Sequence, residues 1–296
     1  MTMRMLVIGL GFSGGAIAAE ALRHGVAVTA TSRDPGPPRP GPSVVPFDAA
    51  GEAIAAATHL VVTAPPGEAG DPVLLAHAAA VRDATSLRWV GYISTTGVYG
   101  DHGGAAVDET TPPTPGQPRS RRRRDAELAW EAVLAGRAAL DLLRAGGIYG
   151  PGRSALDDLR AGTARRVSRP GHAFSRIYRD DIAQAVLAAA LAPPPSGTRV
   201  LHLVDDEPAE SAAVTEYAAA LLGITPPPAI PFAEAERAMS PMARSFWAEN
   251  RRVDNARTKA ALGLRWRYPS FREGLAAILA EERQQFAPQQ GEVLRP

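Results

Sequence analysis

Cysteine is absent from this chain of 296 residues, and lysine occurs only once, as Lys259. Without cysteine the chain cannot form disulfides, use a catalytic thiolate or bind zinc through thiolates, and it is compatible with a reducing compartment. The six histidines show no spacing typical of a metal site. No apolar run reaches the roughly 18 residues that span a bilayer, and the N-terminus lacks a signal-peptide cleavage region. We therefore expect a cytoplasmic protein with no metal site and no membrane partner.

The sequence also lacks an excess of charge of one sign. Acidic residues number 31 and basic residues 32, which gives a formal net charge of +1. Proteins that bind nucleic acid usually carry a broad basic surplus, so we expect no nucleic-acid partner. Hydrophobic residues make up 45% of the chain, which is enough for a sizeable core. The positive charge is concentrated locally, because five of the six residues 119–124 are arginine.

The first half of the chain alternates between apolar runs and helical patterns. Residues 5–11 form an apolar run that ends in glycine, which is typical of a strand buried on both faces. A helical pattern and a second strand follow, at 13–25 and 26–33. Further predicted elements are strands at 44–47, 60–63, 88–94 and 138–143, and helices at 72–84 and 121–134. This alternation predicts an α/β fold with a doubly wound parallel sheet, the Rossmann architecture.

The pattern changes after Gly150. Residues 1–150 are predicted to form a dinucleotide-binding Rossmann domain. Residues 151–284 are predicted to form a smaller, mostly helical substrate lobe. A long helix at 181–192 and a strand at 199–204 interrupt this lobe, and we expect both to pack on the first domain. The last residues, 285–296, are expected to be a disordered tail.

Gly9, Gly11 and Gly14 have the GxGxxG spacing, with Phe12 and Ser13 between them. This spacing is weak evidence by itself, but here it follows a predicted strand and opens a predicted helix. In that context the glycines allow a tight turn, a close approach of a pyrophosphate and close packing of the helix on the strand. The helix N-terminus would then hold the phosphates. The alternative is an ordinary strand–helix turn.

The end of the second strand distinguishes NAD from NADP. An acid there binds the ribose hydroxyls of NAD, whereas an arginine accommodates the 2′-phosphate of NADP. The chain has Thr31, Ser32 and Arg33 at this point, and Asp34 follows directly. A hydroxyl beside a guanidinium suits a phosphate, so we expect NADP(H) in preference to NAD(H), with Asp34 as the argument for NAD.

The ends of the next two strands offer further cofactor contacts. Asp48, after the third strand, is expected at the adenine edge. Ala64, Pro65 and Pro66, after the fourth strand, are expected at the nicotinamide half.

Four stretches occur in an order that resembles the extended short-chain dehydrogenase/reductase and sugar-nucleotide epimerase family. They are YISTTGVYGD (92–101), VDETTPPTP (107–115), GGIYGPGR (146–153) and RIYRDDIA (176–183). Three later stretches resemble the atypical, NAD-dependent epimerase-like branch: DDEPA (205–209), LLGITPPP (221–228) and LGLRWRYPSFREGL (262–275). The resemblance covers nearly the whole chain.

The resemblance implies a catalytic Ser or Thr at the end of the fifth strand and a Tyr-x-x-x-Lys on the next helix. Thr95 matches the hydroxyl position, five residues before Gly100. The Tyr and Lys positions fall at Arg119 and Arg123, or one residue later at Ser120 and Arg124. Neither register supplies the tyrosine or the lysine. Glu127 occupies a position where the family's helix often carries a glutamate.

Residues four apart share one face of a helix, so Arg119 pairs with Arg123. If this face points into the cleft, Arg123 keeps the positive charge of the family lysine beside the cofactor. It cannot act as an acid or base, because guanidinium groups do not lose a proton in proteins. The alternative is a solvated helix start. The block lacks the interleaved aromatic residues of a nucleic-acid site.

These observations favour an NADP(H)-dependent oxidoreductase of the extended short-chain type that acts on an unidentified small molecule. The candidate catalytic residues are Thr95, Tyr149 and Arg123, and the proton donor would be Tyr99, Tyr149, Thr95 or water. The alternative is a protein that binds NADP(H) without turnover and serves as a redox sensor or interaction module. A monomer or a homodimer is expected.

Overall fold

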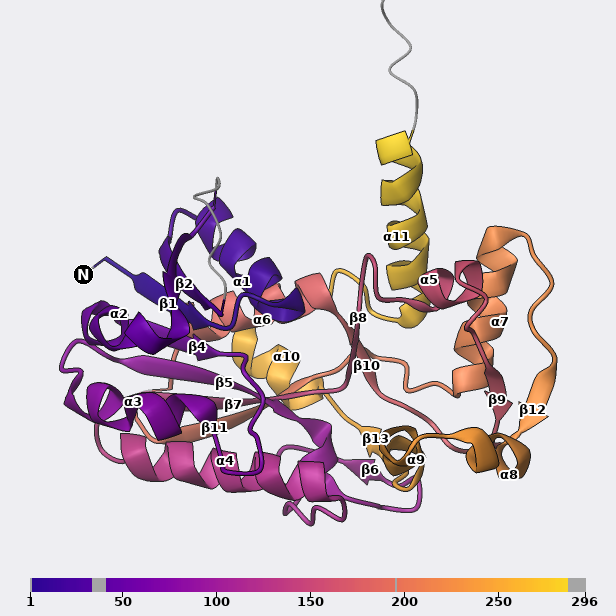
Figure 1. Cartoon of the computed structure of the whole chain (residues 1–296), viewed down its shortest axis with the longest axis horizontal. Coiled ribbons are helices and arrows are strands. Elements are labelled where there is room, and N and C mark those ends of the chain that lie inside the picture. The colour runs from indigo at the N-terminus through magenta and orange to yellow at the C-terminus, as the bar shows by residue number, and fades with distance from the viewer. Residues whose placement is uncertain (1, 34–40, 195, 287–296) are drawn as a thin grey trace, which may run out of the picture.

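The computed structural model describes residues 2–33, 41–194 and 196–286. Seven strands of these residues form one parallel sheet with helices on both faces (Figure 1). The sheet consists of β1 (Arg4–Ile8), β2 (Ala27–Ser32), β3 (Ser43–Pro46), β4 (His59–Val62), β5 (Trp89–Thr95), β7 (Ala139–Ala145) and β11 (Thr198–Leu203). Every neighbouring pair is parallel. The predicted doubly wound sheet is therefore confirmed.

The strand order is β11-β7-β5-β4-β1-β2-β3. Strands β2 and β3 are added on one side of β1. Strand β4 pairs with the other side of β1, and β5, β7 and β11 extend the sheet in that direction. A crevice forms at the carboxyl ends of β1 and β4, where the order reverses, and this is the usual ligand site in open α/β sheets. The four residues 5–8 of β1 are all buried because helices cover both faces of the sheet.

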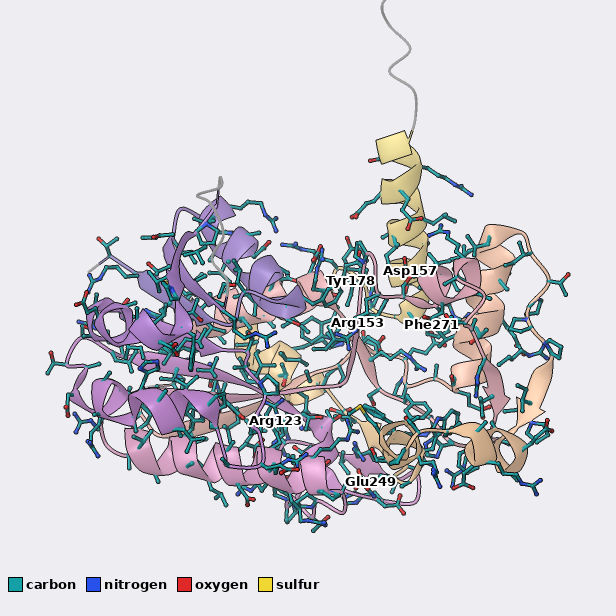
Figure 2. All side chains as sticks on the ribbon, viewed as in Figure 1. Arg123, Arg153, Asp157, Tyr178, Glu249 and Phe271 are labelled. Atoms are coloured by element: carbon teal, nitrogen blue, oxygen red, sulfur yellow. The ribbon has the colours of Figure 1, made fainter. Side chains whose placement is uncertain are left out.

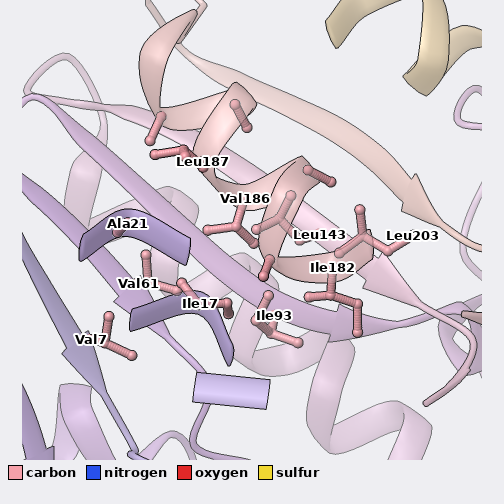
Figure 3. Packing of buried hydrophobic residues seen from close by; sticks show 14 of the residues in the cluster. Val7, Ile17, Ala21, Val61, Ile93, Leu143, Ile182, Val186, Leu187 and Leu203 are labelled. Carbon is pink, nitrogen blue, oxygen red and sulfur yellow. The ribbon is translucent and has the colours of Figure 1, made fainter. Parts of the chain in front are cut away.

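Helices α1 (Phe12–Arg23) and α6 (Arg179–Leu191) pack side by side on one face of the sheet. Val7 and Val61 from the strands meet Ile17 of α1, and Ile93 meets Ile182 of α6 in the same buried cluster (Figure 3). Both helices are rich in alanine, which lets their backbones approach the sheet closely. Each buried Val or Ile contributes about 1.5–3 kcal/mol relative to an exposed one.

Helices α2 (Ala50–Ala56), α3 (Pro72–Asp83) and α4 (Pro118–Leu134) cover the other face of the sheet. Helix α4 carries the arginine block and begins three residues before the predicted start at Arg121. Pro118 occupies its first turn, where the missing N–H costs no hydrogen bond and the fixed φ suits a helix. Trp130, on the buried side of α4, is fully enclosed against the strands.

The remaining elements lie mainly on the right of Figure 1, beyond the carboxyl edge of the sheet. The helices are α5 (Ala155–Arg160), α7 (Ser211–Leu222), α8 (Phe232–Ala235), α9 (Pro241–Trp247), α10 (Ala256–Leu262) and α11 (Phe271–Phe286). Short parallel pairs connect them: β6 (Ala106–Val107) with β13 (Arg252–Val253), β8 (Gly147–Tyr149) with β10 (Arg176–Tyr178), and β9 (Arg166–Ser168) with β12 (Ala229–Pro231).

Two sequence expectations concern the ends of this region. The helix expected at 181–192 is α6 and the strand expected at 199–204 is β11, and both belong to the sheet layer. Residues 285 and 286, the first two of the expected tail, form the end of α11, and residues 287–296 lie outside the described residues. None of the described helices is both long and apolar enough to cross a membrane.

Candidate functional site

Hydrogen bonds with two threonine side chains, Thr31 and Thr63, hold the glycine turn after β1 in place. Gly9 adopts φ +101°, a conformation that favours glycine, and its N–H donates to Thr31 Oγ1 at 3.1 Å. The Thr63 hydroxyl lies 3.0 Å from the Ile8 carbonyl oxygen and 2.7 Å from the Gly9 carbonyl oxygen. A Cβ on Gly14 would overlap the Gly9 carbonyl oxygen, so α1 packs against the turn only because Gly14 has no side chain.

A cavity of about 680 Å³ opens at this turn, in the crevice at the carboxyl ends of β1, β2 and β4. Its lining comes from the glycine turn, the end of β2, the loop after β4 and two neighbouring side chains. The lining residues are Ile8, Gly9, Leu10, Gly11, Thr31, Ser32, Arg33, Phe47, Thr63, Ala64, Pro65 and Pro72. The volume lies within the range of small-molecule and cofactor sites.

The start of α1 provides positive potential beside this cavity. Gly11 is the N-cap of the helix and is solvent-exposed, and a Cβ on it would meet nothing within 4 Å. The first turn therefore offers unpaired backbone N–H groups to an anion. The guanidinium carbons of Arg153 and Arg179 lie 5.5 and 5.0 Å from the Phe12 ring centre, at the first residue of the helix. This arrangement suits a pyrophosphate.

Six of the eleven residues predicted to bind a cofactor line this cavity: Gly9, Gly11, Ser32, Arg33, Ala64 and Pro65. Phe12, Ser13, Gly14 and Pro66 are adjacent in the chain but are not part of the lining. Asp48 is exposed on a 3₁₀ turn, and its neighbour Phe47 reaches the cavity instead. Asp34 lies outside the described residues.

A second cavity, of about 320 Å³, lies beyond the carboxyl end of β5 and is called the Thr95 cleft below. It collects residues from β5, α4, β8, β10, α7, α9 and the end of β13, and from the loops between them. The lining residues are Thr95, Thr96, Arg119, Gly146, Gly147, Ala173, Phe174, Ser175, Arg176, Ser211, Ser245, Phe246, Trp247, Glu249, Arg251 and Val253. Figure 2 labels Glu249 close to α9, in the part of the chain beyond the carboxyl edge of the sheet. The Thr95 hydroxyl accepts from the Gly97 N–H at 3.1 Å.

Comparison with known proteins places this site in a family context. No protein-family model matches the chain. A conserved protein of unknown function from Silicibacter pomeroyi is 41% identical, with a TM-score of 0.86 over 95% of this chain and 99% of that protein. A reductase from Streptomyces sp., named 3-diazoavenalumate denitrifying reductase, is 34% identical over 142 residues, which span 45% of each chain. The match therefore spans less than half of that curated relative.

Two further solved structures that resemble this chain are named as epimerase-family proteins. A candidate NAD-dependent epimerase/dehydratase from Methylobacillus flagellatus is 25% identical, with a TM-score of 0.67 over 96% of this chain and all of that one. The human epimerase family protein SDR39U1, solved with NADPH, has a TM-score of 0.71 at 20% identity, over 94% of this chain and 99% of that one. The structural neighbours are therefore epimerase/dehydratase-like, NAD(P)-binding proteins with a parallel Rossmann sheet, and they fit the resemblance to the extended short-chain dehydrogenase/reductases.

The residues of the two registers that the sequence leaves open for the tyrosine and the lysine lie in different surroundings. Arg119 lines the Thr95 cleft. Ser120 instead is buried and packs against Gly97, since a Cβ added to Gly97 would lie only 2.7 Å from the Ser120 Oγ. Arg124 bonds Glu127 on its own helix at 2.9 Å. Of the four candidate positions, only Arg119 lines the Thr95 cleft among the described residues.

Arg123 lies under the end of β5 rather than in either cavity. Its Nη1 donates to the Ile93 carbonyl oxygen at 2.9 Å and to the Tyr92 hydroxyl at 3.1 Å. Among the described residues, it is part of the lining of neither the cofactor-sized cavity nor the Thr95 cleft. Its side chain is half-buried, so its positive charge is fixed close to the strand end that carries Thr95.

The two tyrosines considered as proton donors bond to other groups. The Tyr99 hydroxyl is buried and donates to His202 Nε2 at 2.5 Å, and burial raises its pKa to about 12. The Tyr149 hydroxyl donates to the Ser270 carbonyl oxygen at 3.2 Å, and burial raises its pKa far above the ordinary value. Neither hydroxyl belongs to a residue that lines the Thr95 cleft. Tyr149 borders a separate cavity of about 460 Å³.

One buried ion pair behind the cleft was missed from the sequence. Arg144, on β7, bonds Glu127 through two contacts of 3.0 and 2.8 Å, and Ser94 donates to the same carboxylate at 2.5 Å. A third Arg144 nitrogen donates to the Tyr99 hydroxyl at 2.8 Å. The sequence signals were Glu127, at a position where the family's helix often carries a glutamate, and Arg144, directly after the predicted strand 138–143. The network connects α4, β5 and β7, and so fixes the helix that carries Arg119.

Proposed function

We propose that this chain is an NADP(H)-dependent oxidoreductase that acts on a small molecule in the Thr95 cleft. One observation carries the proposal: a cavity of cofactor size is lined both by the glycine turn and by Ser32 and Arg33. A phosphate-binding pair at the end of the second strand is typical of NADP sites. The human relative solved with NADPH supports a nicotinamide cofactor. The chain's lack of cysteine is compatible with the cytoplasm as its location.

The residues present fit a dinucleotide. The start of α1 and the exposed Gly11 would hold the pyrophosphate, and Ser32 with Arg33 would hold the 2′-phosphate. Ala64 and Pro65 would border the nicotinamide half. The bound cofactor would supply or accept a hydride. The protein's part is to place a substrate in the Thr95 cleft beside it and to exclude water.

The substrate side differs from the usual short-chain chemistry. Thr95 can orient a substrate oxygen through its hydroxyl. Arg119 and Arg123 carry permanent positive charge and cannot donate a proton at neutral pH. Of the proton donors that the sequence offers, Thr95 and water remain in the cleft, because neither Tyr99 nor Tyr149 lines it. The Streptomyces relative, named as a denitrifying reductase, supports a reduction other than that of a simple ketone.

The same arginines favour a second candidate function, a redox sensor that binds NADP(H) without turnover. Both positions of the Tyr-x-x-x-Lys pair are filled by groups that do not exchange protons. The Thr95 cleft argues against this alternative, because a sensor has no need of a separate cavity lined by Thr95 and three arginines.

The experiment compares binding with turnover. Calorimetric titration gives the affinity for NADPH, and consumption of NADPH is followed with carbonyl, imine, diazo and sugar-nucleotide substrates. Saturable binding with turnover of one substrate class supports the oxidoreductase. Saturable binding with no turnover in any class supports the sensor. No binding of either NADPH or NADH rejects both functions.

A further inference from the structure

Arg119 is an unusual arginine of the Thr95 cleft because no described carboxylate lies within ion-pair distance of it, although the charge of Glu249 acts on it from farther away. None of the ion pairs between described residues includes it, and its Nε is buried with no hydrogen-bond partner. Its guanidinium carbon lies 3.5 Å from the centre of the Phe246 ring. Burial lowers the pKa of Arg119, although not enough to remove its charge. The side chain is therefore a partly desolvated cation, and its Nε–H is a donor that a ligand can use.

The other charges of the cleft leave a positive excess. Glu249 and Arg251 pair at 3.0 Å, so their charges largely cancel. Arg176 donates to two backbone carbonyl oxygens, of Phe174 and Ala209, at 2.8 and 2.9 Å. Glu249 is the only carboxylate that lines the cleft within the described residues, against three arginines. An anionic group is the natural complement, and a singly charged one suits a site that also contains Glu249.

The walls of the cleft are aromatic. Phe174, Phe246 and Trp247 all line it, and the Phe174 and Trp247 ring centres lie 4.9 Å apart in an edge-to-face arrangement. Phe246 is 47% exposed although it is a large apolar side chain. Its ring, on α9, stacks against the guanidinium of Arg119. Flat rings beside a guanidinium favour a planar, aromatic ligand.

We propose that the Thr95 cleft recognises a planar aromatic carboxylate. The guanidinium of Arg119 holds the carboxylate at the position where the family has its tyrosine, and the ring of the ligand packs on Phe246 and Trp247. A carboxylate matches the planar fork of an arginine. A volume of about 320 Å³ accommodates one substituted ring but is small for a sugar nucleotide. The inference rests on the proposed function and adds the substrate class to it.

The test uses calorimetry on the full chain with saturating NADPH. The probes are benzoate, trans-cinnamate and indole-3-acetate, each compared with its uncharged primary amide. We expect at least one acid to bind about tenfold or more tightly than its amide. Arg119→Met should reduce binding of that acid to the level of the amide, and Arg119→Lys should recover part of it. Arg121→Met is the matched control, because Arg121 lies on the same helix but is exposed.

Phe246→Ala tests the aromatic wall. It should weaken binding of the acid and of its amide by the same factor, because it removes the ring contact and not the charge. The inference is overturned if all three acids bind no better than their amides, or if Arg119→Met and Arg121→Met behave alike. NADPH titration of each variant separates this result from failure of the proposed function, because the cofactor cavity does not include Arg119.

Discussion

Arg144 and Glu127 form a bidentate ion pair inside the protein, between strand β7 and helix α4. Their side chains are 3% and 0% exposed. Removing one partner of such a pair leaves an uncompensated buried charge, which typically costs about 3–5 kcal/mol. Arg144→Met should therefore lower the free energy of unfolding, measured with urea, by about 3 kcal/mol.

Two variants complete this experiment. Arg122→Ala is the control, because Arg122 is a partly exposed member of the same helix and its nearest acid, Glu68, is 3.9 Å away; it should change stability by less than about 0.5 kcal/mol. The double variant Arg144→Met with Glu127→Leu should lose less than the sum of the single losses. Equal stability of Arg144→Met and wild type would contradict the structural role given to the pair.

The sequence predicted the sheet because its central strands are apolar runs separated by helices of ordinary length. It missed β6, β8, β9, β10, β12 and β13, which have two or three residues each and are too short to show a period. Counting left either Arg119 with Arg123 or Ser120 with Arg124 at the family positions, and it could not show that only Arg119 of these lines the cleft. It also could not pair Arg144 with Glu127, because the contact depends on how α4 packs on the sheet.

Gly11→Val tests whether the glycine turn binds a cofactor. A Cβ at this position projects into open space beside the cavity, so the fold should be retained while the pyrophosphate is kept from the backbone. NADPH binding, measured by calorimetry, should be lost. Gly15→Ala, in the next turn of the same helix and also unobstructed, should bind normally. Unchanged affinity in a folded Gly11→Val protein would mean that the loop is only a turn.

Arg123 supplies a fixed positive charge near the end of β5. Arg123→Ala should raise the apparent dissociation constant for NADPH or the KM for an anionic substrate, and Arg123→Lys should recover part of the loss. Arg122→Ala should have little effect on either constant. If Arg123→Ala and Arg122→Ala behave alike in binding and turnover, Arg123 only supports the end of β5 through its hydrogen bonds to Ile93 and Tyr92.

Asp205 gives a pH dependence of stability with a defined sign. Burial raises its pKa from 3.8 to about 8, although nearby Arg176 opposes the shift. The folded state therefore holds a proton that the unfolded state releases, so this residue's contribution to stability falls as pH rises from about 4 to about 8. Asp205→Asn should gain stability relative to wild type as the pH rises through that range, in urea unfolding series. A stability difference that stays constant with pH would contradict this prediction.

The central claim, that the cavity at the glycine turn is an NADP(H) site, is tested most directly by parallel calorimetric titrations of wild type and Arg33→Ala with NADPH and NADH. Wild type should bind NADPH more tightly than NADH. Arg33→Ala should weaken NADPH by about tenfold or more, because it removes a charge-assisted contact to the 2′-phosphate, and should leave NADH nearly unaffected. Equal losses for both cofactors, or a wild-type preference for NADH, would contradict the claim.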